Sequence, residues 1–218
     1  MQPRKIFVAG STGAIGRTLL ALEESRRVPI VAHARPGPRD AALDPRTLVF
    51  DLSDSSALDA ALLGATTIVQ LIGTIRSRFG LGDTYETSDI ATTRSLVDGA
   101  KRAGCDHFVL LSAVLAGVPI GSYLEAKAKA ESIVRESGIP NTIFRPSTFV
   151  GDRHKARPLS RAVTTALGLQ RLIPIEVTAL ARAILWSAAE RAWAGEILEG
   201  ASLWSAVERA AGRAETPD

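Results

Sequence analysis

The chain has 218 residues, of which 46% are hydrophobic and 22% are charged, values typical of a single globular domain. This composition excludes disorder, collagen and coiled coil as descriptions of the whole chain. Its 26 basic and 23 acidic residues leave a net charge of +3, too small by itself to indicate nucleic-acid binding. The single cysteine, Cys105, cannot form an internal disulfide, so the fold needs no oxidising compartment.

Hydropathy indicates no targeting or membrane segment. The apolar run before Gly10 is shorter than the core of a secretory signal, and no uncharged run approaches the roughly 20 residues of a membrane helix. We therefore expect a cytoplasmic protein that acts on a small molecule, without a nucleic-acid partner or a membrane span, as a monomer or a homodimer.

Apolar runs and amphipathic stretches alternate along the chain. In chain order, the predicted strands are residues 6–9, 30–34, 48–50, 67–72, 107–111 and 141–144. The predicted helices between them are residues 12–26, 55–63, 88–103 and 122–137. Beyond Gly151 the pattern weakens, and the expected elements are helices over 158–169, 178–190 and 202–211 and a small strand over 196–198.

Continuous apolar strands separated by helices predict an α/β fold with a doubly wound parallel sheet. We expect one domain over residues 1–218, in which residues from about 151 to 218 form a small substrate-side cap. Ligands of such sheets bind outside the carboxyl ends of the strands. The residues at those ends are Gly10, Arg35, Asp51, Gly73, Ser112 and Pro146.

A glycine-rich loop follows the first strand and opens the first helix. It has the spacing GxxGxxG, and its residues are Gly10, Ser11, Thr12, Gly13, Ala14, Ile15 and Gly16. Glycines allow the backbone to approach a pyrophosphate, and the helix presents free N–H groups to the anion. The loop therefore predicts a dinucleotide site, the alternative being a tight turn without a ligand.

The end of the second strand favours NADP over NAD. An NAD site usually has a carboxylate there for the ribose 2′-hydroxyl, yet no acidic residue occurs between this strand and Asp40. Arg35 and Arg39 are instead available to pair with a 2′-phosphate. The alternative is that both are solvated loop arginines.

Three later strand ends add candidate cofactor contacts. Asp51 is placed to accept from the adenine amino group with Leu52 against the ring, whereas Asp54 would cap the following helix. Ile72 and Gly73 end the fourth strand, where a side chain at Gly73 would crowd the cofactor. Pro146 ends the sixth.

Tyr123 and Lys127 are one helical turn apart and share a face of the helix over 122–137. The lysine cation favours the phenolate form of the tyrosine, which is then able to exchange a proton with a carbonyl or alcohol. Ser112 is a candidate to hydrogen-bond the same oxygen, and Lys127 to hold the nicotinamide ribose. The alternative is a charged surface helix, to which Lys129 and Glu131 would belong.

Together these motifs resemble the short-chain dehydrogenase/reductase superfamily. The resemblance covers residues 5–153 and is strongest to atypical, NAD(P)H-binding members similar to the Tat-interacting-protein oxidoreductase. The segments that carry it, besides the GxxGxxG loop and the Tyr123–Lys127 pair, are Leu71-Ile72-Gly73-Thr74, Ala103-Gly104 with the following strand to Ser112, and Phe144-Arg145-Pro146.

The resemblance implies a Rossmann fold, NADP(H), and Ser–Tyr–Lys chemistry on a small carbonyl or alcohol. Ser112, Tyr123 and Lys127 would be the catalytic residues. Some members of the group are redox-sensing regulators without activity, so a non-catalytic NADPH-binding sensor is one alternative, and a nucleotide-sugar epimerase-like enzyme is another. The three histidines share no metal-ligand spacing, so no metal is expected. The basic stretch over 153–171 is interpreted as a solvated face.

Overall fold

A computed structural model describes residues 4–37, 42–73, 84–150 and 170–214 of the chain. Its strands are β1 (Ile6–Ala9), β2 (Ile30–Ala34), β3 (Thr47–Val49), β4 (Thr67–Gln70), β5 (His107–Leu111), β6 (Asn141–Arg145), β7 (Phe149–Val150), β8 (Ile175–Glu176) and β9 (Ile197–Glu199). Its helices are α1 (Ala14–Ala21), α2 (Ser55–Ala61), α3 (Thr92–Ala103), α4 (Ser122–Glu136), α6 (Val177–Glu190) and α7 (Ala201–Ala214). Shorter helical segments are η1 (Glu23–Arg27), η3 (Glu86–Ala91) and η4 (Gln170–Leu172).

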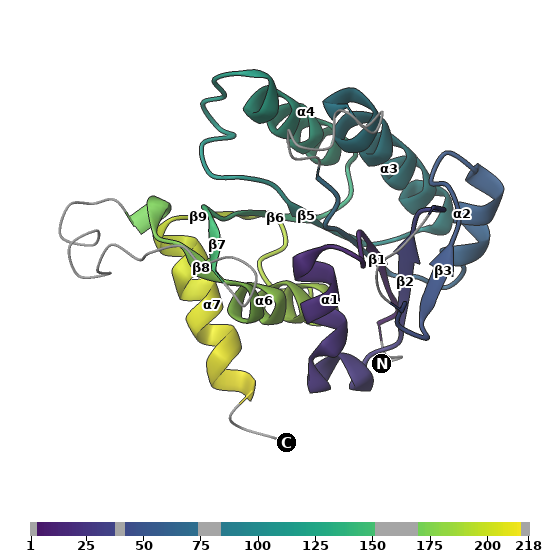
Figure 1. Ribbon diagram of the computed structural model, residues 1–218, viewed down its shortest axis with the longest axis horizontal. Coiled ribbons are helices and arrows are strands. Elements are labelled where there is room, and N and C mark those ends of the chain that lie inside the picture. Colours follow the sequence, from purple (N-terminus) through teal and green to yellow (C-terminus); the bar gives the residue numbers. More distant parts are fainter. Residues whose placement is uncertain (1–3, 38–41, 74–83, 151–169, 215–218) are drawn as a thin grey trace.

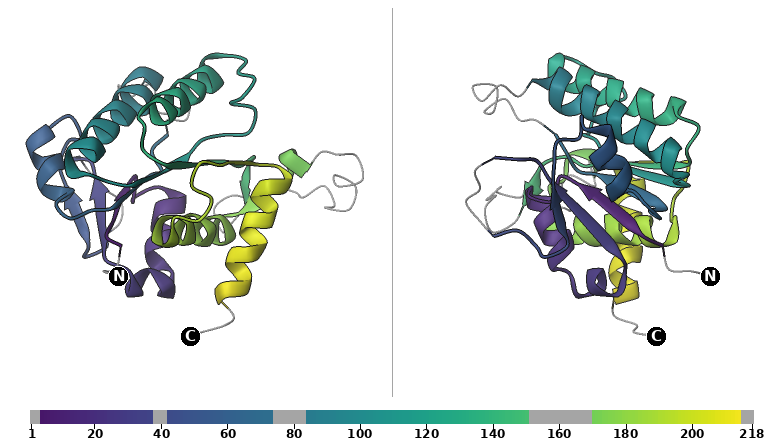
Figure 2. Two further views of the ribbon diagram at one scale, coloured as in Figure 1. Left: turned by 180° about the vertical axis from the view of Figure 1, so that it is seen from behind. Right: turned by 90° about the vertical axis from the view of Figure 1, so that its right-hand side faces the viewer.

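Seven strands form one parallel sheet in the order β3-β2-β1-β4-β5-β6-β9, and β7 pairs with β8 in a small separate sheet. Helices α2, α3 and α4 cover one face of the large sheet, and α1, α6 and α7 cover the other (Figure 1). Figure 2 shows the same three layers from behind and from the side. The predicted doubly wound Rossmann fold is confirmed.

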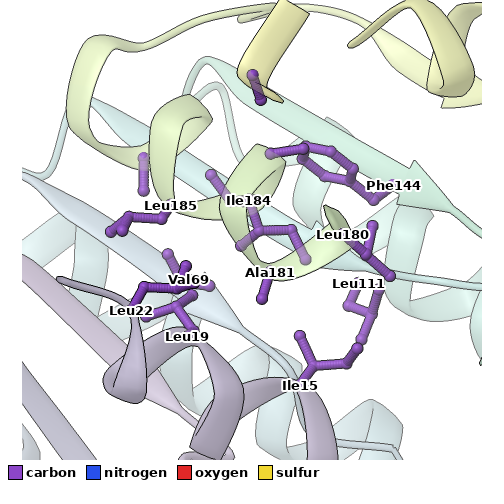
Figure 3. Packing of buried hydrophobic residues seen from close by; sticks show 14 of the residues in the cluster. Ile15, Leu19, Leu22, Val69, Leu111, Phe144, Leu180, Ala181, Ile184 and Leu185 are labelled. Atoms are coloured by element: carbon purple, nitrogen blue, oxygen red, sulfur yellow. The ribbon is translucent and has the colours of Figure 1, made fainter. Parts of the chain in front are cut away.

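The strands are continuous apolar runs because both faces of the sheet are buried. In β1, Ile6 and Val8 pack into the core under α1 and α6, whereas Phe7 and Ala9 pack into the core under α2 and α3. Figure 3 shows the first core, where side chains of α1 meet those of α6 against the sheet. Alternate side chains of one strand therefore serve two cores.

The first helix is shorter than predicted. The apolar pattern predicts a continuous helix over residues 12–26, but α1 ends at Leu22, whose φ of −61° and ψ of 138° are extended. Arg46, itself paired with Asp44, donates to the carbonyls of Leu20 at 2.7 Å and Ser25 at 3.0 Å. These bonds from a distant segment satisfy the carbonyls at the helix end, and the chain continues as η1.

The segment before α3 also departs from the prediction of one helix over 88–103. Residues Glu86–Ala91 form a π-helix, and the α-helix begins only at Thr92. Within this wider turn Asp89 is buried, and the Thr93 hydroxyl donates to its carbonyl. The π-helix thus places a carboxylate inside the protein.

The expected division of the chain, with residues from about 151 to 218 as a cap, stays a prediction. Part of this segment has a second role, because β9 extends the main sheet and α6 packs against α1, β4 and β5. The strands β7 and β8 carry two residues each and were not predicted, since so short a run has no periodicity. The helix expected over 158–169 lies outside the described residues.

Candidate dinucleotide and catalytic site

The glycine-rich loop after β1 packs so closely that side chains would not fit. Gly10 has a φ of +90°, and a Cβ there would lie 2.9 Å from the Leu71 carbonyl carbon after β4. A Cβ on Gly16 would overlap the Gly10 carbonyl oxygen and lie 2.7 Å from the Ser11 Cα. The loop therefore folds back onto the first turn of α1, with β4 beside it.

The loop leads into the first turn of α1, whose amides have no acceptor within the helix and would meet an anion. The Gly13 amide is used within the loop, where it donates to the Gly10 carbonyl at 3.1 Å. Ser11 donates through both its amide and its hydroxyl to the His33 carbonyl in β2, at 3.3 and 2.8 Å, and its side chain is thereby committed to the protein. Thr12 and Gly13 are exposed, and α1 begins at Ala14 with no acidic residue in its first turn. Ile15 packs into the core, so it would contribute its backbone alone. This cradle fits a pyrophosphate.

The next strand ends bring the other predicted dinucleotide contacts to the same edge of the sheet. Arg35 follows β2 and is exposed, while Arg39 lies outside the described residues. Asp51 follows β3 and accepts from the Ser53 amide and hydroxyl, both at 2.8 Å, which lowers the pKa of its carboxyl. Leu52 is buried. Asp54 caps α2 through Ser56 and Ala57, as predicted.

Tyr123 and Lys127 share one face of α4. The Tyr123 side chain is partly open to solvent, with 37% of its surface exposed, whereas Lys127 is only 5% exposed. The Lys127 Nζ lies 5.9 Å from the centre of the Tyr123 ring. The Tyr123 ring also lies near that of Tyr85, with centroids 5.8 Å apart. A buried cation thus lies beside a tyrosine that reaches the surface.

The Lys127 ammonium lies at the end of β4. Its Nζ forms a 2.7 Å ion pair with Asp89 Oδ1, and a Cβ on Gly73 would lie 2.7 Å from the same nitrogen. A side chain at Gly73 would therefore displace Lys127. Ile72, one residue earlier, is half-buried against the core under α2 and α3.

Ser112 is buried and belongs to a chain of polar side chains. Its hydroxyl donates to Glu131 Oε1 at 2.5 Å. Glu131 also accepts from Arg145 Nε at 2.9 Å and Nη2 at 2.5 Å, and Arg145 Nη1 donates to Glu199 Oε2 at 3.0 Å. The hydrogen bonds to Glu131 raise the pKa of Arg145. These polar contacts connect α4, β6 and β9 to Ser112, the residue that follows β5.

Pro146 supports the loop that carries Ser112. It is buried after β6, and its carbonyl accepts from the Val114 amide at 2.9 Å. Its predicted cofactor contact stays a prediction, as do the catalytic roles of Ser112, Tyr123 and Lys127.

The sequence interpretation missed three charged residues of this site, namely Asp89, Glu131 and Arg145. Assigning Glu131 to a solvated helix face is wrong, because the residue is 3% exposed. The available signal was its spacing, since Glu131 follows Lys127 by one helical turn and Tyr123 by two. Arg145 was identified only as part of the Arg-Pro motif, and nothing signalled the burial of Asp89, because the residues around it are mostly polar.

His107 and Cys105 pack in the interior, as predicted. His107 Nε2 lies 3.0 Å from the Thr142 hydroxyl, and burial lowers the pKa of this histidine to about 4. Burial raises the pKa of the Cys105 thiol to about 11.

Of the basic stretch 153–171, residues 153–169 lie outside the described residues. None of the helices in the described ranges is long and apolar enough to cross a membrane.

Comparison with known proteins places this geometry in a family. Residues 10–185 match the NAD(P)H-binding family. The chloroplast divinyl chlorophyllide a 8-vinyl-reductase of Oryza sativa subsp. indica is 33% identical over 161 residues, which cover 66% of this chain and 40% of the relative. The chain therefore spans about two fifths of that reductase. An NAD(P)H azoreductase from Xenophilus azovorans is 25% identical over 226 residues, covering 95% of this chain and 74% of the relative.

A solved structure shows the same fold. It is a short-chain dehydrogenase/reductase superfamily protein from Agrobacterium tumefaciens with bound NAD, which superposes with a TM-score of 0.66 at 18% identity and covers 98% of this chain and 84% of its own. The predicted resemblance to atypical short-chain dehydrogenases/reductases is confirmed, and the chain belongs to the NAD(P)H-binding family.

Proposed function

We propose that this protein is an NADP(H)-dependent reductase that moves a hydride between the nicotinamide and a small carbonyl or alcohol. The observation that carries the proposal is the position of Lys127. It is buried on the tyrosine's face of α4 and ends beside Gly73, at the strand end next to the glycine-rich loop. A cation in this place serves both a reacting tyrosine and a ribose.

Each residue then has a defined task. Tyr123 gives its phenolic proton to the substrate oxygen during reduction and takes it back during oxidation. The Lys127 ammonium stabilises the phenolate, and because it has three donors it holds Asp89 with one and keeps others for a ribose. Bound NADPH would supply the hydride. Ser112 contacts the reacting oxygen.

The preference for NADP(H) is proposed from the end of β2. Arg35 is exposed directly after the strand, and no carboxylate stands at the position where an NAD site has one. The planar guanidinium of an arginine there is able to form two parallel hydrogen bonds to oxygens of the 2′-phosphate.

The test is a comparison of Tyr123→Phe with Tyr85→Phe, which removes a hydroxyl from the neighbouring ring. The substrates are a panel of aldehydes, ketones and quinones, together with an azo dye because one relative is an azoreductase. We expect Tyr123→Phe to lower kcat at least about 100-fold and to leave NADPH affinity unchanged, while Tyr85→Phe stays within a few-fold of the parent. Turnover that survives in Tyr123→Phe would contradict the proposal.

One observation favours a second function, that of a non-catalytic NADPH-binding sensor. Ser112 and Lys127 are both engaged by buried carboxylates, Glu131 and Asp89 respectively. A parent protein that binds NADPH and reduces no member of the panel would favour the sensor.

A further inference from the structure

The bond from Ser112 to Glu131 decides whether the serine hydroxyl donates to or accepts from any further partner. A serine hydroxyl has one proton to donate and two lone pairs that accept. In this structure the proton goes to Glu131 Oε1 at 2.5 Å, a length typical of a bond from a hydroxyl to a carboxylate. Toward any other partner, Ser112 is left with lone pairs alone.

Glu131 is held in a position from which it takes this proton. Arg145 donates to both of its oxygens, and Glu199 holds Arg145 from the other side at 3.0 Å. Ser112 and Glu131 are 5% and 3% exposed, so water does not compete for the bond. A charge-assisted bond in such an environment is stronger than the contact of a hydroxyl with a neutral carbonyl.

We propose that Glu131 is a positioning residue that fixes Ser112 as a hydrogen-bond acceptor toward the substrate, so that the site prefers a substrate O–H over a carbonyl oxygen at this position. The inference rests on the proposed function. In reduction, the carbonyl oxygen takes its proton from Tyr123, and the O–H of the alcohol so formed donates to Ser112. The Ser112–Glu131 pair thus favours binding of the alcohol over binding of the carbonyl compound.

A methionine at position 131 keeps the length of the side chain and removes the acceptor. A glutamine would not serve, because Glu131 Oε1 accepts from both Ser112 and Arg145 Nε, and an amide oxygen in that position would still take the serine proton. Without the carboxylate, the Ser112 proton is released toward the substrate. Glu199→Met is the matched control, because it removes the other carboxylate from Arg145 without touching Ser112.

The experiment measures the dissociation constants of benzaldehyde and benzyl alcohol as probes, with the protein saturated by NADP⁺, for the parent, Glu131→Met, Glu199→Met and Ser112→Ala. We expect Glu131→Met to shift the aldehyde-to-alcohol affinity ratio toward the aldehyde by about five- to tenfold, and Glu199→Met to leave the ratio within about twofold. In the Ser112→Ala background, Glu131→Met should not change the ratio. An equal shift in both methionine variants, or a shift that persists without Ser112, would overturn the inference.

A neutron diffraction map of the cofactor-free parent gives a second readout that requires neither turnover nor a variant that folds. Deuterium on Ser112 Oγ is expected on the line to Glu131 Oε1. Deuterium on any other side of Oγ contradicts the inference whatever the enzyme does. Absence of turnover with deuterium on that line would instead count against the proposed function alone.

Discussion

Single buried carboxylates determine where the cations of the site lie. Asp89 comes from the π-helix before α3 and holds Lys127, while Glu131 comes from α4 and holds Arg145. In both pairs the side chains are almost completely buried, so each charge depends on its partner. We therefore expect that removing one of these carboxylates lowers the stability of the protein strongly.

Asp89→Asn keeps the shape of the side chain and leaves the Lys127 ammonium buried without a counter-charge. We expect the free energy of unfolding to fall by about 3 kcal/mol, as for other buried pairs that lose one partner. Urea denaturation measures it. The control is Asp59→Asn, which breaks the exposed Arg102–Asp59 pair and should move the urea midpoint little. Equal effects of the two variants would argue against a buried ion pair at Lys127.

His107 predicts a pH dependence of stability. Burial lowers its pKa to about 4 in the folded protein, against about 6.5 in an unfolded chain. Between these values the unfolded state binds a proton that the folded state does not, so stability is lost as the pH falls from about 6.5 to 4. The expected slope is about 1.4 kcal/mol per pH unit.

The check is urea unfolding at several pH values for the parent and for His107→Gln. His107 Nε2 donates to the Thr142 hydroxyl, whose own proton goes to the Trp193 carbonyl at 2.9 Å, and a glutamine amide is able to donate in its place. His33 contributes in the same direction in both proteins, because its pKa is also lowered by burial. The difference between the two slopes of stability against pH gives the contribution of His107. Identical slopes would contradict the lowered pKa of His107.

Among the elements, the loop between β5 and α4 connects the fold to the chemistry. It leaves the sheet at Ser112 and extends over the ends of β6 and β9 before α4 begins (Figure 1). The Leu115 amide lies 3.4 Å from Glu199 Oε1. Gly117 lies so close to Arg145 that a Cβ there would be 2.7 Å from Nη1. The loop is thus shaped around the guanidinium.

Gly117→Ala tests this contact. Arg145 is held by two carboxylates and has little freedom to move away, so we expect the extra methyl group to weaken the Arg145–Glu199 pair. The predicted cost is about 1–3 kcal/mol in the free energy of unfolding. We also expect a lower kcat, because a shift of Arg145 moves Glu131, and Glu131 positions Ser112. Val118→Ala in the same loop is the control, since Val118 is 73% exposed. A Gly117→Ala protein as stable and active as this control would contradict the packing.

Elements whose signals are local were predictable from the sequence. The strands β1, β2 and β5 have the predicted bounds because an uninterrupted apolar run is what a doubly covered parallel strand requires. Tyr123 and Lys127 share a face through helical periodicity alone. The end of α1 at Leu22 was not predictable, because it depends on Arg46, which lies more than 20 residues further along the chain.

The same limit applies to the site. The Ser112–Glu131, Lys127–Asp89 and Arg145–Glu199 contacts join residues that are 19 to 54 positions apart. Only the folded sheet brings them together, so a single sequence shows the charges without their partners. Those pairings decide which charged residues are buried.

At the scale of the whole molecule, the parallel sheet brings the glycine-rich loop, Arg35, Asp51 and Lys127 to one edge. The strand order reverses between β1 and β4, and a doubly wound sheet binds its ligand at such a point. There a Cβ on Gly10 would meet the backbone after β4, and a Cβ on Gly16 would meet the loop itself. The arrangement is that of a dinucleotide site.

The most direct measurement is calorimetric titration of the protein with NADPH and with NADH, for the parent, Arg35→Gln, Gly16→Ala and Gly212→Ala. Gly212 is also a helical glycine, in α7, but a Cβ there meets no neighbouring atom. We predict micromolar binding of NADPH, weaker binding of NADH, a selective loss of NADPH affinity in Arg35→Gln, and loss of both ligands in Gly16→Ala but not in Gly212→Ala. Failure of both nucleotides to bind the parent protein would contradict the account, and equal affinity for the two would contradict the role of Arg35.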